Sequence, residues 1–268
     1  MEIIHSKDGT PIAYWHSGEG TPLLLVHGTT ADHHLWTPVL PALERHFSVY
    51  TMDRRGRGHS GDADTYALER EWEDITAVID AVAAASGAPV DVVAHSFGAM
   101  SALEASRLTA NVRRLILYEA PLPLGRQFWP PEFSGPMQAL MDAGDREGAL
   151  LLFLRDIVKM PPQDIASAQA SPMWQGLVAA VHTISRELQS VNGYLFEPKR
   201  FAAMQTPTLL LLGGDSPPFR RTAAEALHAA LPNSRILVLP GQQHSAIRTA
   251  PDLFAQQVVE FLTGAAAG

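Results

Sequence analysis

The 268-residue chain contains no cysteine, which excludes disulfides, thiol nucleophiles and thiolate metal ligands together. Charged residues are few, at 18%, and no apolar run approaches the ~18 residues that a membrane-spanning helix needs. The net charge of −8 disfavours nucleic acid and anionic membranes as partners. The first ten residues, MEIIHSKDGT, lack a basic segment followed by an apolar one. We therefore expect no signal peptide and a cytoplasmic location.

What the chain does contain is an alternation of short apolar runs with amphipathic stretches, typical of an α/β domain. The length fits a single domain of this class. We expect strands over residues 2–5, 11–16, 23–27, 47–53, 90–95, 112–118, 208–213 and 235–239, and helices over 69–85, 97–108, 220–231 and 253–262. The C-terminal GAAAG is expected to fray.

The alternation stops between residues 121 and 204, where helical stretches are interrupted by Pro-Pro pairs. This segment holds five of the eight Met and five of the ten Phe residues. Such adaptable apolar side chains suit a lid over an apolar pocket, although they also suit the core of an ordinary helical subdomain. We predict a core made of residues 1–121 and 205–268, with a helical cap over residues 122–204.

Ser96 stands at a predicted strand-to-helix junction in the stretch VVAHSFGA. A serine held there with strained backbone angles needs small residues two positions before and after it, and these are Ala94 and Gly98. The stretch resembles the G-x-S-x-G nucleophile elbow, with Ala in place of the first Gly. The motif by itself equally fits a serine that caps the following helix.

Three further motifs accompany Ser96. LLLVHGTT at residues 23–30 and DRRGRGHSG at 53–61 precede it, and PGQQH, which ends at His244, follows it. With Ser96 they resemble the α/β-hydrolase fold superfamily, in particular serine esterases and lactonases with a helical cap. The resemblance spans residues 20–125 and 205–262. It implies a mostly parallel eight-stranded sheet flanked by helices, with the cap inserted after strand six.

The same resemblance implies roles for particular residues. Ser96 is the expected nucleophile and His244 its base, because imidazole can accept and return a proton near neutral pH. The backbone amides of Thr29 and Phe97 are the expected oxyanion hole. The loop at 53–61 is structural in this superfamily, so we assign it no chemistry.

The acid that orients His244 has two candidates. The usual position, three residues after Gly213, holds Ser216, and Asp215 lies one position early. Haloalkane dehalogenases and zearalenone lactonases can instead place a Glu after strand six, where this chain has Glu119. An unpaired carboxylate ending an apolar strand would be unfavourable, so we favour Glu119. Asp215 stays open as the alternative acid, or as a turn or helix-capping residue.

The motifs predict a serine hydrolase that cleaves an ester, lactone or thioester of a small to medium apolar substrate through an acyl-enzyme. No cofactor or metal is implied, and the oligomeric state is not set by the sequence. The same triad also serves C–C bond hydrolysis, perhydrolysis and lyase or cyclase steps on this fold. A non-catalytic small-ligand receptor is a further alternative, but such a protein is expected to lose Ser96 or His244.

Overall fold

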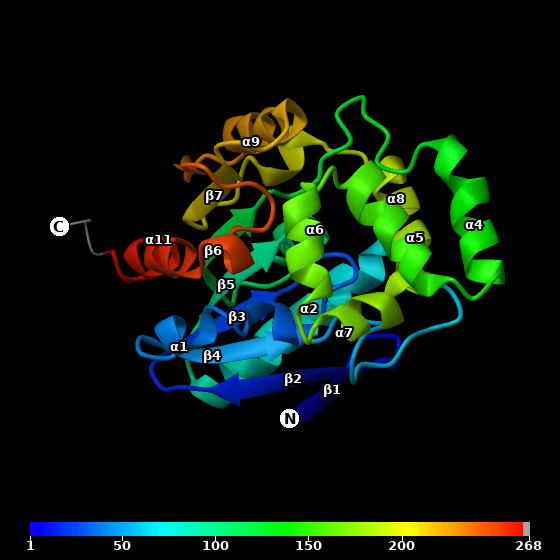
Figure 1. Cartoon of the computed structure of the whole chain (residues 1–268). Helices are drawn as coiled ribbons and strands as arrows, with labels where there is room; N and C mark the ends of the chain where they lie inside the picture. Colours follow the sequence, from blue (N-terminus) through cyan, green and yellow to red (C-terminus); the bar gives the residue numbers. More distant parts are fainter. Residues whose placement is uncertain (265–268) are drawn as a thin grey trace.

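The computed structural model describes residues 1–264 (Figure 1). The predicted fraying of GAAAG falls outside the described residues except for Gly264. Eight strands form one sheet in the order β1-β2-β4-β3-β5-β6-β7-β8. Their bounds are β1 Glu2–His5, β2 Pro11–Ser17, β3 Thr21–Val26, β4 Phe47–Met52, β5 Val90–His95, β6 Val112–Tyr118, β7 Thr208–Gly213 and β8 Ser234–Leu239. All eight predicted strands are present, within two residues at their ends.

The pairing of the strands explains their sequences. β1 and β2 pair antiparallel, β2 pairs antiparallel with β4, and the strands from β4 to β8 pair parallel. The inner strands β3 and β7 are buried on both faces, which is why they are continuous apolar runs rather than alternating ones. The predicted mostly parallel eight-stranded sheet is confirmed.

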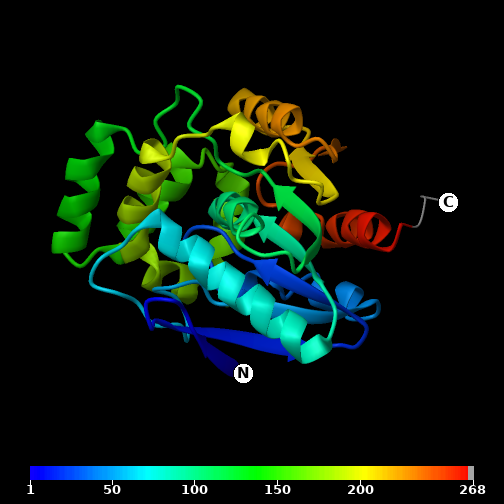
Figure 2. The same cartoon turned by 180° about the vertical axis from the view of Figure 1, so that it is seen from behind.

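Helices cover both faces of the sheet (Figures 1 and 2). α2 (Leu68–Ser86), α3 (Phe97–Ala105) and α9 (Pro218–Ala230) pack on one face, and α1 (Leu40–Leu43) and α11 (Pro251–Thr263) on the other. The helix predicted over residues 97–108 ends earlier, at Ala105, because the amides of Arg107 and Leu108 bond three residues back in a tightened last turn. α9 begins before the predicted Arg220, because proline is tolerated in the first turn of a helix.

The segment between β6 and β7 contains no strand, and its helices gather beside one end of the sheet (Figure 1). They are α4 (Ser134–Asp142), α5 (Arg146–Leu152), α6 (Pro162–Gln169), α7 (Trp174–Ala179) and α8 (Ile184–Gly193). We call residues 122–204 the cap segment. Its buried side chains, including Trp174 and Ile184, belong to one apolar cluster with side chains of α2 and α3. The cap segment and this face of the sheet therefore share a core.

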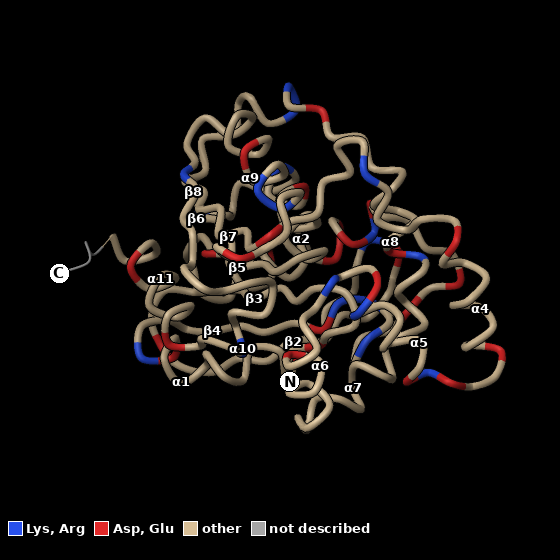
Figure 3. Tube along the Cα trace, turned by 45° about the horizontal axis from the view of Figure 1, so that its top comes forward, with Lys and Arg blue, Asp and Glu red and all other residues tan. Residues whose placement is uncertain are grey.

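A buried group of charges also joins the cap segment to the core. Arg54 pairs with Glu71 of α2 at 2.8 Å and with Glu187 of α8 at 2.7 Å, and Arg57 contacts Glu187 as well. None of these four side chains is more than 1% exposed. The loop at 53–61, expected to be structural, thus reaches the cap segment. Over the rest of the chain, positive and negative residues are interspersed (Figure 3).

Within residues 1–264, we find no helix both long enough and apolar enough to cross a bilayer. A cytoplasmic location stays a prediction.

Candidate active site

Ser96 joins β5 to α3 with φ 54° and ψ −126°, a strained conformation for a residue with a side chain. Neighbouring glycines make room for this turn. A Cβ on Gly98 would lie 2.2 Å from the carbonyl oxygen of His27, and one on Gly28 would lie 2.9 Å from Cβ of Ser96. Position 94, where the motif departs from glycine, is fully buried and accommodates a methyl group. Close packing between the ends of β3 and β5 therefore stabilises the strained backbone conformation of Ser96.

His244 lies between Ser96 and Glu119. Its Nε2 is 3.0 Å from Oγ of Ser96, and its Nδ1 is 2.6 Å from Oε2 of Glu119. Glu119 directly follows β6 with φ 51°. Its other oxygen, Oε1, accepts hydrogen bonds from the amide of Gly213 (2.9 Å) and from the hydroxyl of Ser216. All three side chains thus meet at the carboxyl ends of parallel strands, as expected for sites on this kind of sheet.

Asp215 is exposed in the turn after β7, and its amide donates to the carbonyl of Gln242. Among the described residues, its side chain has no recorded contact with His244. It does not cap α9 either, because the residue before that helix is Pro217 and no side chain caps it. Ser216, at the usual position of the acid, instead donates to Glu119. The structure therefore brings Glu119 to His244 and leaves Asp215 in a turn.

Arg220 of α9, which the sequence analysis did not single out, lies against this pair. Its Nε is 3.1 Å from Oε2 of Glu119, at an angle that makes an ion pair and not a hydrogen bond. Burial alone would raise the pKa of Glu119, but Arg220, His244 and Ser216 outweigh it and lower the pKa to about 2. Burial lowers the pKa of His244 to about 4; Arg220 adds to the fall and Glu119 opposes it.

The lowered pKa values of Glu119 and His244 define the protonation states of these two groups near neutral pH. Glu119 is a carboxylate and His244 is neutral. The Nδ1–H of His244 then donates to Glu119, which leaves the Nε2 lone pair facing the hydroxyl of Ser96. The arrangement can take the serine proton at the moment when Oγ attacks an electrophile.

The loop that carries His244 is held by two strand side chains. The hydroxyl of Tyr118 donates to the carbonyl of Gln243 and accepts from the amide of Ala246 at 3.2 Å. Nε2 of His95 donates to the carbonyl of His244 at 3.0 Å. Burial lowers the pKa of His95 well below its usual range, and the proximity of His244 and Arg220 adds to this, so His95 is neutral. These bonds fix the backbone at His244 on both sides.

A family model described as the alpha/beta hydrolase family matches residues 23–257. The chain belongs to this family. It is similar over 97% of its length to all of an alpha/beta hydrolase structure from Sphaerobacter thermophilus, with 36% identity and a TM-score of 0.82. It is 25% identical to the pimeloyl-[acyl-carrier protein] methyl ester esterase of Neisseria meningitidis serogroup C, over 90% of this chain and 93% of the relative.

A third likeness is local. The chain is 35% identical over 107 residues to the probable oxidoreductase EphD of Mycobacterium tuberculosis, covering 38% of its own length. The match spans 18% of that relative, which is a much longer protein.

An apolar pocket of about 90 Å³ opens beside Ser96 and His244. Residues outside the cap segment, such as Leu35 and Ile247, form one wall of this pocket. The cap segment supplies the rest, through Phe153, Leu154, Val158, Met160, Ala168, Met173 and Leu177. Two of the Met residues noted in the sequence therefore lie on the pocket wall, whereas Met137 is core.

The two residues predicted to supply the oxyanion-hole amides are Thr29, in the lining of the pocket, and Phe97, directly after Ser96. Thr29 follows β3 and lines the pocket, and Phe97 is the first residue of α3, where an amide has no acceptor within the helix. Among residues 1–264, no hydrogen bond is recorded from either amide. Their role as an oxyanion hole stays a prediction.

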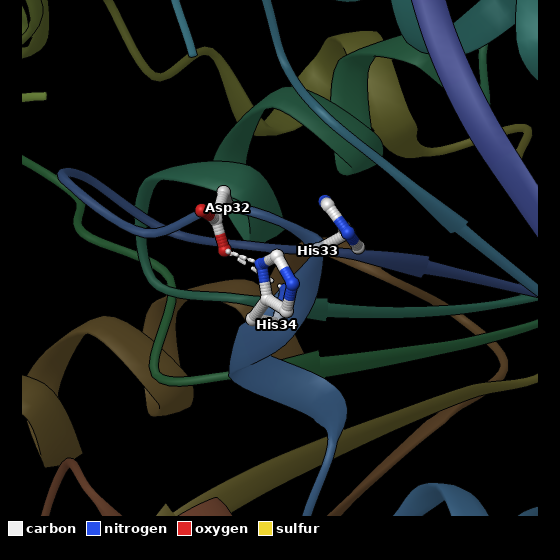
Figure 4. A group of neighbouring side chains, drawn as sticks. All are labelled: Asp32, His33 and His34. Carbon is white, nitrogen blue, oxygen red and sulfur yellow. Dashed lines mark hydrogen bonds and ion pairs between the residues drawn. The ribbon is translucent and has the colours of Figure 1, made fainter. Parts of the chain in front are cut away.

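One group elsewhere offers metal-ligating atoms: Asp32, His33 and His34, whose ligand atoms lie within 4.8 Å of one another (Figure 4). Each already has a local function. Asp32 Oδ1 accepts from the amide and from Nδ1 of His34, at 2.9 and 3.1 Å, and caps a short 3₁₀ helix. Nδ1 of His33 lies 2.7 Å from the buried carboxylate of Asp53. These bonds account for the group without an ion.

Proposed function

We propose that the protein is a serine hydrolase that cleaves an ester, lactone or thioester of a small to medium apolar substrate through an acyl-enzyme. The observation that carries this proposal is the unbroken line of hydrogen bonds from Ser96 through His244 to Glu119 at an apolar pocket. The likeness to a methyl ester esterase supports ester chemistry at this site.

In the proposed reaction, His244 Nε2 accepts the proton of Ser96 as Oγ attacks the substrate carbonyl carbon. The amides of Thr29 and Phe97 stabilise the negative oxygen of the tetrahedral intermediate. Its collapse breaks the bond to the leaving group, which takes the proton from His244. His244 then deprotonates a water molecule that attacks the acyl-enzyme, releasing the acid and restoring Ser96. Glu119 holds the imidazole in the required tautomer throughout.

The cap segment, in this proposal, is a lid that keeps water from the acyl-enzyme and binds the apolar part of the substrate. Support comes from the seven cap residues on the pocket wall. C–C bond hydrolysis, perhydrolysis and lyase steps use the same three groups, so they differ from the proposal in substrate and not in site.

The proposal is tested by assaying p-nitrophenyl esters, lactones and thioesters with the wild type and with Ser96→Ala. The substitution should lower kcat by at least ~10³-fold without unfolding the protein, because it removes the hydroxyl that faces Nε2 of His244. Ser86→Ala, at the exposed end of α2, is the control and should keep wild-type activity. A Ser96→Ala protein that retains half of the activity would rule the proposal out.

A further inference from the structure

The pocket beside Ser96 contains one permanently charged side chain. Its lining residues include no Lys, Asp or Glu, and Arg248 is the single arginine among those that the structure describes. Arg248 belongs to α10 (Ala246–Thr249), four residues after His244. Its guanidinium nitrogens are not fully buried, so they stay open to solvent or to a ligand at this otherwise apolar wall.

The guanidinium of Arg248 has no partner in the described part of the chain. No side-chain hydrogen bond and no ion pair within 4.0 Å is recorded for it, whereas the buried Arg54, Arg55 and Arg220 are all paired with carboxylates. Burial lowers the pKa of Arg248, and the charge of Asp164 of α6 opposes this without forming an ion pair with it. Arg248 is thus a partly desolvated cation without a counterion.

The charge of Arg248 also affects His95, which is next to the proposed nucleophile Ser96. It contributes to the lowered pKa of His95, the residue that precedes Ser96 and lines the same pocket. The net charge of the protein is −8, so an anionic substrate would be repelled unless a local cation attracted it.

We propose that Arg248 binds a carboxylate of the substrate, so that the hydrolase prefers esters or lactones that carry a carboxylate. This inference rests on the proposed function. A guanidinium binds a carboxylate through two parallel hydrogen bonds, and an apolar surrounding strengthens them. One cation matches a singly charged anion, whereas a phosphate dianion would leave a charge unpaired in the pocket.

The first experiment compares two esters of equal chain length, mono-p-nitrophenyl glutarate and p-nitrophenyl valerate, which differ in a terminal carboxylate. Arg248→Gln should lower the ratio of their kcat/KM values ~10- to 100-fold, mainly through KM for the glutarate, with Arg248→Lys in between. Arg221→Gln, an exposed arginine on α9, is the control and should leave the ratio unchanged. Ser96→Ala gives the uncatalysed background.

A second experiment does not depend on catalysis: calorimetric titration with hexanoate and with hexanol. Hexanoate should bind the wild type and lose at least ~10-fold in affinity in Arg248→Gln, while hexanol should not distinguish the two proteins. If neither ester is hydrolysed but hexanoate binding needs Arg248, the proposed function fails and the carboxylate site stands.

Two results would overturn the carboxylate site. One is an unchanged glutarate-to-valerate ratio together with unchanged hexanoate binding in Arg248→Gln. The other is an equal loss on both esters, matched in Asp164→Asn, which would make Arg248 a contact to the cap segment and not to substrate.

Discussion

At the residue scale, the state of His244 depends on two charges that flank it on the side away from Ser96. Glu119 selects the tautomer by accepting from Nδ1, and Arg220 favours the carboxylate form of Glu119 and, together with burial, the neutral form of His244. Arg220 also compensates the charge of Glu119, which is fully buried. Two predictions separate these contributions.

The first prediction concerns the acid. Glu119→Gln should lower kcat ~10²- to 10⁴-fold, because an amide does not stabilise the imidazolium and can hold the wrong tautomer. Asp215→Asn should leave kcat close to the wild-type value, since Asp215 is exposed in a turn. Both variants are to be assayed on the same ester. The reverse order of the two effects would mean that Asp215 is the acid.

The second prediction concerns pH. His244 is active when neutral, so kcat/KM should fall as the pH drops through the pKa of His244 at about 4. Arg220 lowers that pKa, and therefore Arg220→Met should raise it and move the acid limb of the profile to higher pH. The measurement is kcat/KM across the acid range, with Arg221→Met as the control. A limb that stays in place or moves to lower pH would contradict the assigned role of Arg220.

At the element scale, α8 of the cap segment is tied to the 53–61 loop and α2 by buried ions. Glu187 of α8 contacts both Arg54 and Arg57, and Glu71 of α2 completes the group. Burial lowers the pKa of Arg57 to about 9, Arg54 adds to the fall, and Glu71 opposes it. The amide of Arg54 also donates to Nε2 of His27, next to Gly28. The position of α8 is thus linked to the strand end beside Ser96.

The third prediction tests this link. Glu187→Gln should lower the free energy of unfolding by about 3–5 kcal/mol, because it leaves two buried arginines with one carboxylate. Glu197→Gln, an exposed glutamate of the cap segment, should change it little. Urea denaturation of both variants gives the comparison. Equal effects would show that the buried ions do not hold α8 in place.

At the scale of the whole molecule, the cap segment and the sheet are not independent bodies. Apolar residues of α5, α7 and α8 share one cluster with α2, α3 and the sheet, and the ion group adds to this contact. A lid that opens must therefore move parts of the cap segment and not all of it. The pocket residues Met160 and Met173 lie outside α4–α8, in the connections between helices.

The fourth prediction follows from the shared core. In hydrogen exchange at rising urea concentration, peptides from α8 and from α2 should open together, because their side chains are in one cluster. Peptides from β1, a mostly exposed edge strand, should open earlier and serve as the internal control. If α8 opens at clearly lower urea than α2, the cap segment is a separate folding unit.

The sequence by itself determined the strands, the position of the helical insertion and the place of Ser96. Residues adjacent in the sequence determine each of these features. An apolar run such as 209–212 must be buried on both faces of the sheet, and the small residues around Ser96 permit its turn. Helix ends were less well determined, because the end at Ala105 depends on a tightened turn with no glycine to mark it.

The tertiary structure alone decided which side chains meet. Glu119 and Asp215 follow adjacent parallel strands, so the sequence favoured Glu119 but left Asp215 open as the alternative acid. The positive φ at Glu119 turns its carboxylate toward His244, and Gly213 and Ser216 hold it there. Arg220 meets Glu119 across about 100 residues of chain, and Arg248 meets the cap residues of the pocket in the same way. Such pairings are set by strand register and helix packing, which no local pattern encodes.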